Sequence, residues 1–185
     1  MVDATWNLDA SDGELLVRTG VTGRAAKMGH RLTIRMTSWQ AAVSWSVDQP
    51  TAVDLSVEVD SLQVLRGDGG LAPLSAPEKV LVRSSALKCL QSNRYPRIRF
   101  QANDVSMTGA GYRLTGALTV QDRTHQHVVD VRVSDLGESW RMHGETEVRQ
   151  SDYGVKRYSM LMGAMQVADT VTVSLAATRT KSAAG

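Results

Sequence analysis

Apolar and polar residues alternate along most of this chain, most clearly from Tyr112 to Val133. Every second residue from Tyr112 to Val120 is apolar or glycine. After a polar turn at 121–124, the valines at positions 129, 131 and 133 alternate with charged residues. A period of two is typical of a β-strand with one dry face and one wet face. The stretch therefore predicts two strands folded back on each other as a hairpin.

The same alternation predicts strands in eight further segments: 6–9, 14–19, 30–36, 39–47, 51–60, 95–107, 139–149 and 170–177. The chain contains no repeat of fixed length and no sign of a second domain. About ten strand-like segments predict an all-β antiparallel fold with about eight main strands. A closed barrel is favoured over an open sheet, because closure removes the exposed edges of a sheet.

Residues 77–90 have a helical period instead. Here one face carries Val80, Ser84, Leu87 and Leu90. Pro77, followed by a glutamate, suits the first turn of a helix. The segment predicts one amphipathic helix that packs on, or plugs, one end of the sheet.

Three segments between the predicted elements do not alternate. Residues 21–29 and 67–77 are rich in glycine or proline, which predicts loops. Residues 153–166 form a long apolar connection that holds three methionines. Methionine adapts to irregular apolar shapes, so this connection is either a loop packed over one barrel end or a lid at a cavity mouth.

Length and charge narrow the class of protein. The chain has 185 residues, which predicts a single domain over 1–178 and a small polar tail, 179–185, expected to be disordered. Its 21 basic and 19 acidic residues are interleaved, so no nucleic-acid partner is expected. Cys89 is the only cysteine, which excludes an internal disulfide and a cysteine-rich metal site.

The N-terminal residues 1–14 include acids and no apolar run, unlike a secretory signal. No stretch approaches the roughly 20 apolar residues of a membrane-spanning helix. We therefore expect a cytoplasmic protein with no stable membrane insertion, although a chain that had lost a leader would look the same. A homodimer is left open.

Five motifs together resemble the YceI-like family, whose members are lipocalin-like barrels linked to the binding of polyisoprenoids or other lipids. The resemblance runs from about Trp6 to Ala177, and its specificity comes from the order and spacing of the motifs. They are Trp6-Asn7-Leu8-Asp9; Val57 to Gly67; Arg94-Tyr95-Pro96 with Ile98 and Phe100; Gly116-Ala117-Leu118-Thr119 followed by Thr124; and Ser151-Asp152-Tyr153-Gly154 leading into Val167-Ala168-Asp169-Thr170-Val171.

The resemblance implies a lipocalin-like barrel with an extended apolar cavity for a long-chain apolar molecule such as an isoprenoid, quinone or fatty-chain lipid. It implies no catalysis, and we expect no cofactor. His127 stands where relatives commonly have valine, so we expect any head-group end of the cavity near it. The candidate ligand-binding residues are His30, Ile34, Trp39, Val43, Trp45, Leu118, His127, Val129, Val131, Trp140, Tyr158, Met160, Met162 and Met165.

The histidines leave a metal site or an enzyme open as an alternative. His30, His125 and His127 fall at the starts of predicted strands, where they could ring a barrel rim, whereas His143 lies on a charged face. Two histidines at i and i+2 can chelate a metal, but zinc requires at least one further ligand. Hydrogen bonding to backbone or water is the commoner role of such histidines, and contact with a polar ligand head is a third possibility.

Other signs of catalysis are absent from the sequence. It contains no GxSxG, Walker loop, HExxH or CxxC motif. Arg97 and Arg99 alternate with Ile98 and Phe100, so we expect them on a solvated surface and not in a phosphate clamp. A cavity-free structural or stress protein remains the other alternative, because aliphatic side chains can fill a small barrel completely.

Overall fold

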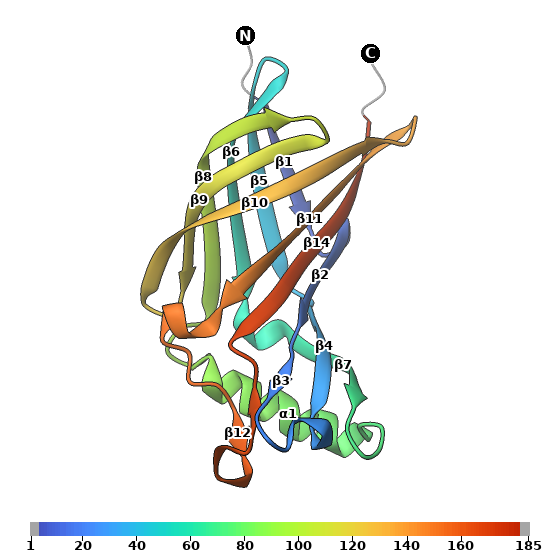
Figure 1. The fold of residues 1–185 in the computed structure, drawn as a ribbon. Helices are drawn as coiled ribbons and strands as arrows, with labels where there is room; N and C mark the ends of the chain where they lie inside the picture. Colours follow the sequence, from blue (N-terminus) through green and yellow to red (C-terminus); the bar gives the residue numbers. More distant parts are fainter. Residues whose placement is uncertain (1–3, 182–185) are drawn as a thin grey trace.

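One antiparallel sheet of eleven strands makes up most of the fold (Figure 1). The computed structural model describes residues 4–181. In spatial order the strands are β1 (Ala4–Asp9), β5 (Trp39–Ser46), β6 (Gln49–Glu58), β8 (Arg97–Thr108), β9 (Gly111–Val120), β10 (Arg123–Asp135), β11 (Ser139–Arg149), β14 (Thr170–Thr180), β2 (Gly13–Arg18), β4 (His30–Met36) and β7 (Leu62–Gly69).

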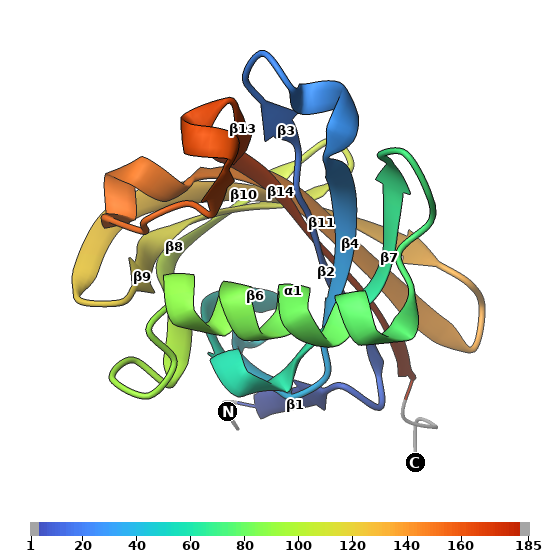
Figure 2. The ribbon, with the colours of Figure 1, turned by 90° about the horizontal axis from the view of Figure 1, so that it is seen from below.

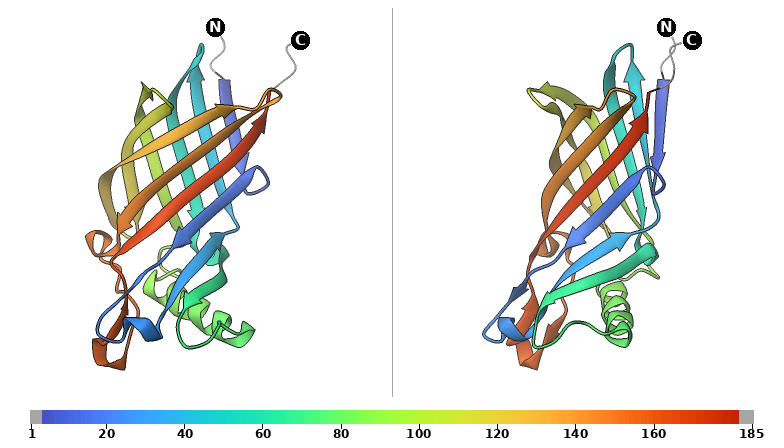
Figure 3. Two further views of the ribbon diagram at one scale, coloured as in Figure 1. Left: turned by 45° about the vertical axis from the view of Figure 1, so that its right-hand side comes forward. Right: turned by 90° about the vertical axis from the view of Figure 1, so that its right-hand side faces the viewer.

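The sheet curls into a half-barrel (Figure 3), which confirms the predicted all-β antiparallel class. The first eight strands in this order form the barrel wall, and β2, β4 and β7 extend it toward the end that bears the helix (Figure 1). Within residues 4–181, no strand pairing joins the edge strands β1 and β7, so strand pairing does not close the barrel as the sequence analysis expected. The wall is instead linked by Arg179 of β14. Its Nη1 donates to the carbonyl of Asn7 in β1 at 3.3 Å, and its guanidinium lies 4.9 Å from the centre of the Trp6 ring.

The predicted hairpin is present as β9 and β10, with the strands in register. Val131 pairs with Tyr112, Val129 with Leu114, and His127 with Gly116. Side chains of directly paired residues point to the same face of a sheet. The dry face foreseen from the alternation is therefore one continuous inner surface across the two strands.

Charged side chains cover the outer face of the same wall. Arg97 pairs with Glu58 at 2.7 Å and Arg99 with Asp54 at 2.8 Å, each across neighbouring strands. These contacts confirm that the two arginines point outward. Because the ion pairs are exposed to solvent, they orient the surface more than they stabilise the fold.

Among the described residues there is one α-helix, α1 (Ala76–Cys89), which crosses one end of the half-barrel (Figure 2). This end lies opposite the start of β1 and the end of β14 (Figure 1). Ser75 caps it in a capping box with Glu78. Lys79 Nζ and Arg83 Nε each donate, at 2.7 Å, to carbonyls of the edge strand β7, those of Leu65 and Leu62. These side chains satisfy edge acceptors that no further strand covers.

The predicted inner face of the helix was partly wrong. Leu87 and Leu90 pack against the core, but Val80 is 68% exposed and Ser84 is also exposed. The hydrogen bonds of Lys79 and Arg83 to β7 fix the rotation of the helix about its axis. As a result, Val82, Ser85, Ala86 and Cys89 face the barrel interior instead.

The non-alternating segments contain more structure than the sequence predicted. Strand β7 runs to Gly69, into the predicted loop 67–77, and pairs with β4. Its sequence, LQVLRGDG, mixes charges and glycines, and β4 shifts register between Thr33 and Ile34, so the alternation is hidden. Within the segments predicted as a loop and an apolar connection, β3 (Val21–Thr22), β12 (Ser159–Met160) and β13 (Met165–Val167) form a second, three-stranded sheet.

The described residues also contain four short 3-10 helices: η1 (Ala26–Met28), η2 (Val59–Ser61), η3 (Gln150–Tyr153) and η4 (Leu161–Gly163). Strand β14 continues to Thr180, so Arg179 and Thr180 of the predicted tail belong to the sheet; residues 182–185 lie outside the described part. Over residues 4–181, α1 is neither long nor apolar enough for a membrane-spanning helix.

The close pairing of β8 and β9 gives a test of the fold. A Cβ added at Gly116 would lie 2.3 Å from the backbone oxygen of Gln101, so Gly116→Ala must push the two strands apart. We expect a loss of about 1–3 kcal/mol in the free energy of unfolding, measured by urea titration. Gly109→Ala is the control, because nothing lies within 4 Å of its added Cβ. Equal stability of the two variants would contradict the predicted clash.

Candidate ligand cavity

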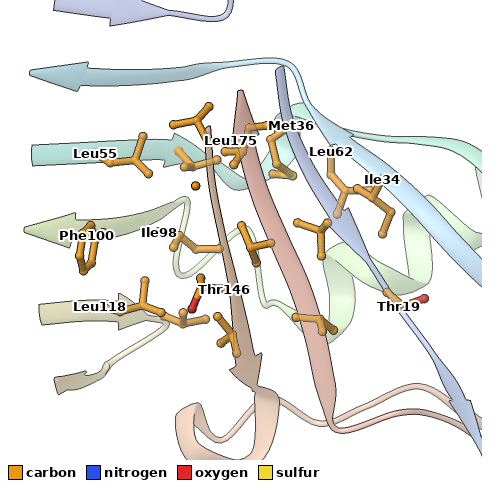
Figure 4. Close-up of a pocket in the computed structure, with 18 of the residues that line it drawn as sticks. Thr19, Ile34, Met36, Leu55, Leu62, Ile98, Phe100, Leu118, Thr146 and Leu175 are labelled. Carbon is orange, nitrogen blue, oxygen red and sulfur yellow. The ribbon is translucent and has the colours of Figure 1, made fainter. Parts of the chain in front are cut away.

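The half-barrel encloses a cavity of about 1190 Å³. Its wall is mainly apolar and is built by strands from both sheets together with α1 (Figure 4). Leu55, Phe100 and Leu118 come from neighbouring strands β6, β8 and β9 and point into the same space as Leu175 of β14. Pockets for small molecules commonly measure about 300–1,000 Å³. This cavity is therefore larger than most small-molecule pockets.

The wall side chains are half-buried although they face inward. Examples are Val53 of β6, Val131 of β10 and Val173 of β14. An eight-stranded barrel is just wide enough for its side chains either to fill it or to leave room for one ligand. Here the inner positions carry mostly valine, leucine and alanine, and Phe100 is the only phenylalanine in the chain. The inward side chains are therefore too small to meet across the barrel.

Two packed clusters flank this space. One includes Leu8, Met36 and Trp39, with side chains of α1 packed against it. The other includes Phe100, Leu114 and Tyr153. The core is thus divided into filled regions and a hollow one, which answers the alternative of a fully packed, cavity-free interior.

Twelve of the fourteen predicted ligand-binding residues line the cavity: His30, Ile34, Val43, Trp45, Leu118, His127, Val129, Val131, Trp140, Tyr158, Met160 and Met165. The other two do not. Trp39 is 2% exposed and lies within a packed cluster. Met162 is fully exposed, outside the cavity. Strand parity gave the correct face for Trp39, but a face does not reveal how deeply a residue is packed along the barrel.

His127 and Thr146 form a polar pair on the apolar wall. The His127 Nε2 lies 2.8 Å from Thr146 Oγ1, and the imidazole meets the Phe100 ring edge-on, with centroids 6.5 Å apart. Burial lowers the pKa of His127 below its ordinary value of 6.5. The imidazole is therefore neutral at neutral pH, and the pair offers hydrogen bonding without a charge.

The other predicted rim histidines have separate partners. His30 Nε2 donates to the carbonyl of Ala72 at 2.7 Å, and His125 Nε2 donates to that of Asp152 at 2.9 Å. His125 also packs edge-on against Tyr153. Tyr153 lines the cavity, but His125 does not. Within residues 4–181, no three His, Cys, Asp or Glu side chains come close enough to hold a metal ion. The geometry thus gives no support to a rim metal site.

Tryptophans gather at the cavity end that lies away from α1. The rings of Trp6 and Trp45 are 4.4 Å apart, and Trp140 has the Lys181 ammonium 4.1 Å from its centre. All three tryptophans line the cavity. Sequence analysis did not include Trp6 among the site residues, although its strand was predicted. The available signal was its position two residues before Leu8, which places both side chains on the same face of the strand.

Three further lining residues were not among the predicted site residues, two of them on α1 and one on β11. Leu81 and Cys89 come from α1, whose rotation is set by β7. Burial raises the pKa of the Cys89 thiol, so it stays protonated and behaves as a small apolar side chain. Thr146 lies in the segment 139–149 that was predicted as a strand, but its pairing with His127 depends on the register between β10 and β11.

Comparison with known proteins agrees with this architecture. A family model described as the YceI-like domain matches residues 6–178. The chain belongs to the YceI-like family. The predicted resemblance is therefore confirmed. No curated protein sequence gives a match.

Two solved structures share the fold. BcnA of Burkholderia cenocepacia has a TM-score of 0.71 at 16% identity, with 94% of this chain and 99% of that chain covered. The YCEI protein of Campylobacter jejuni has a TM-score of 0.59 at 11% identity, with 81% and 85% covered. The YceI-like fold is a β-barrel known for binding apolar ligands.

The buried histidine makes the stability of this protein depend on pH. Because the pKa of His127 is lowered in the folded state, the unfolded chain takes up a proton first as the pH falls below 6.5. Protonation therefore favours unfolding. We expect the urea midpoint to drop between about pH 7 and about pH 5.

His127→Val should reduce this drop, because it removes the buried titrating group. The exposed His143 gives the matched control, and His143→Val should keep the pH dependence of the unmodified chain. If His127→Val and the unmodified chain lose stability in parallel, burial of this imidazole does not couple to folding.

Proposed function

We propose that this protein binds a long apolar molecule inside its barrel and holds it without chemical change. The main observation that supports this proposal is the cavity of about 1190 Å³ with an apolar wall. The candidate ligands are an isoprenoid, a quinone or a fatty-chain lipid. Membership of the YceI-like family supports this proposal.

The binding energy follows from the burial of hydrocarbon. Each methylene moved from water to an apolar site contributes about 0.8 kcal/mol. A chain of about a dozen carbons gains roughly 10 kcal/mol, of which the loss of translational and rotational freedom takes several. Useful affinity therefore needs no charged anchor. Shape and length of the ligand are expected to matter more than its polar group.

The middle of the wall favours an uncharged ligand. Its polar pair, His127 and Thr146, carries no net charge at neutral pH. An ion moved into such surroundings would lose its hydration without gaining an opposite charge. We propose that a neutral polar group of the ligand, such as a quinone carbonyl or a hydroxyl, meets this pair.

A non-enzymatic role agrees with the arrangement of the polar residues. In the described part of the chain, the rim histidines hydrogen-bond to separate partners and do not converge on one point of the cavity. Binding and carriage need only the apolar wall. The expected cytoplasmic location and the possible homodimer stay predictions.

The direct test is to identify what the purified protein carries. The protein is denatured in organic solvent, and the extract is analysed by mass spectrometry. We expect a long-chain apolar compound in an amount comparable to that of the protein. Protein that yields no lipid, and whose melting temperature does not change with prenyl chains, would overturn the proposal.

A substitution that fills the cavity tests where the ligand sits. Val129 lines the cavity, whereas its neighbour Val128 is 46% exposed on the outer face of the same strand. Val129→Phe should lower the affinity for a fluorescent prenyl or fatty-chain probe at least tenfold, because the ring takes ligand space. Val128→Phe adds the same ring outside and should leave the affinity unchanged. Equal affinity of the two variants would place the ligand elsewhere.

A further inference from the structure

Exposed apolar side chains concentrate at the end of the molecule that carries α1. Twelve large apolar side chains are exposed among the described residues. Eight of them belong to η1, the β7–α1 loop, α1 and the segment 158–162: Met28, Leu71, Val80, Leu81, Tyr158, Met160, Leu161 and Met162. Figure 1 places these segments together at the end opposite the start of β1 and the end of β14. A cluster of this kind on a protein surface marks an interaction site.

Five of these eight residues lie on two segments, 21–28 and 156–167, which we call the lip. Hydrogen bonds hold the two segments of the lip together. Strands β3, β12 and β13 join its two segments in one small sheet, and the amide of Ala25 donates to the carbonyl of Ala164 at 2.8 Å. At its tip, Met162 is fully exposed. This apolar side chain is therefore in contact with water and is not packed against the rest of the lip.

The lip borders the mouth of the cavity. Its residues Met28, Tyr158, Met160 and Leu161 are exposed, yet they also line the cavity. Viewed from this end, α1 runs across the barrel opposite the lip (Figure 2). Leu81 of α1 is likewise exposed and also lines the cavity. The exposed apolar surface is thus continuous with the apolar wall inside.

The charge of the lip differs from that of the rest of the chain. It carries Arg24, Lys27, Lys156 and Arg157 and no acidic residue, a net charge of +4. The whole chain has a net charge of +2, so the remainder sums to −2. Arg157 lies 3.7 Å from Asp169. Arg24, Lys27 and Lys156 are exposed, and within residues 4–181 no carboxylate oxygen lies within 4.0 Å of their charged nitrogens.

We propose that the lip docks on an anionic lipid membrane, with the η4 tip inserted among the acyl chains and the lysines at the level of the headgroups. Apolar side chains flanked by cations suit the boundary between headgroups and acyl chains, where long basic side chains reach back to the phosphates. A protein partner fits less well, because lysine is depleted in protein–protein interfaces.

Docking at this end gives the cavity direct access to the bilayer. A long apolar ligand could then pass between the membrane and the cavity along the exposed residues of the mouth, without crossing water. This transfer step rests on the proposed function. The docking itself does not, since it depends on the lip alone.

The test is flotation of the full chain with two kinds of vesicle, phosphatidylcholine alone and phosphatidylcholine mixed with phosphatidylglycerol. We expect binding to the mixed vesicles that weakens as salt is added. Lys27→Gln combined with Lys156→Gln should lower the partition coefficient on mixed vesicles about thirtyfold. Met162→Ser should lower it about tenfold on the same vesicles, because the tip loses its apolar contact.

Matched variants away from the lip control for these changes. Met107 is 69% exposed on the β8–β9 hairpin at the opposite end, so Met107→Ser removes an exposed methionine away from the lip. Arg132→Gln combined with Arg141→Gln removes two exposed charges from the outer face of β10 and β11. These variants should bind mixed vesicles like the unmodified chain.

Three results would overturn the proposal: no flotation of the unmodified chain with mixed vesicles, equal losses in the lip variants and their controls, or a dimer in light scattering that Met162→Ser dissociates while vesicles stay unbound. Failure of the proposed function is separable. Val129→Phe should lose the apolar probe yet still float, whereas Lys27→Gln with Lys156→Gln should keep the probe and no longer float.

Discussion

A wall of eight strands encloses more volume than its inward side chains can fill, and the rest of the structure follows from this mismatch. Each strand contributes one inward residue in every two, and here those residues are mostly valine, leucine and alanine. Side chains of that size reach only part of the way across an eight-stranded barrel. The result is a core in which packed clusters border an apolar space, and in which many inner residues stay half-buried.

The curled sheet has to satisfy two edges, since no strand pairing joins β1 to β7 in the part of the chain that the structure describes. Long cationic side chains serve both edges. Arg179 donates to a carbonyl of β1, and Lys79 and Arg83 of α1 donate to carbonyls of β7. The second set of bonds also fixes the helix across one barrel end. Edge protection and the shape of the cavity mouth therefore depend on the same contacts.

Charged side chains lie on the outer face of the wall, whereas the cavity inside is mainly apolar. Ion pairs such as Arg113 with Asp130 lie outside, where solvent keeps the charges hydrated. Inside, the polar pair His127 and Thr146 is uncharged, which an apolar cavity tolerates at a smaller cost in free energy. Three exposed cations without a carboxylate neighbour among residues 4–181, Arg24, Lys27 and Lys156, occur instead on the lip, beside the mouth. The interior thus suits neutral hydrocarbon, and the mouth suits an anionic surface.

The sequence alone determined most strands of the large sheet, the hairpin and the face on which most residues lie. The reason is that a strand has a period of two, so Val129, Val131 and His127 must share a side whatever the rest of the fold does. The same period placed Arg97 and Arg99 outside. The motifs of the YceI-like family, spaced over nearly the whole chain, added the fold and suggested the class of ligand that we propose.

Only the tertiary structure decided depth, rotation and hollowness. Trp39 and Trp45 share a face, yet one is packed in the core and the other lines the cavity, because depth along the barrel depends on what the other strands and α1 place there. Val80 turned outward because hydrogen bonds to β7 set the rotation of α1. Whether alternating faces surround a filled core or a cavity depends on the curvature of the whole sheet, a property that no single stretch of sequence carries.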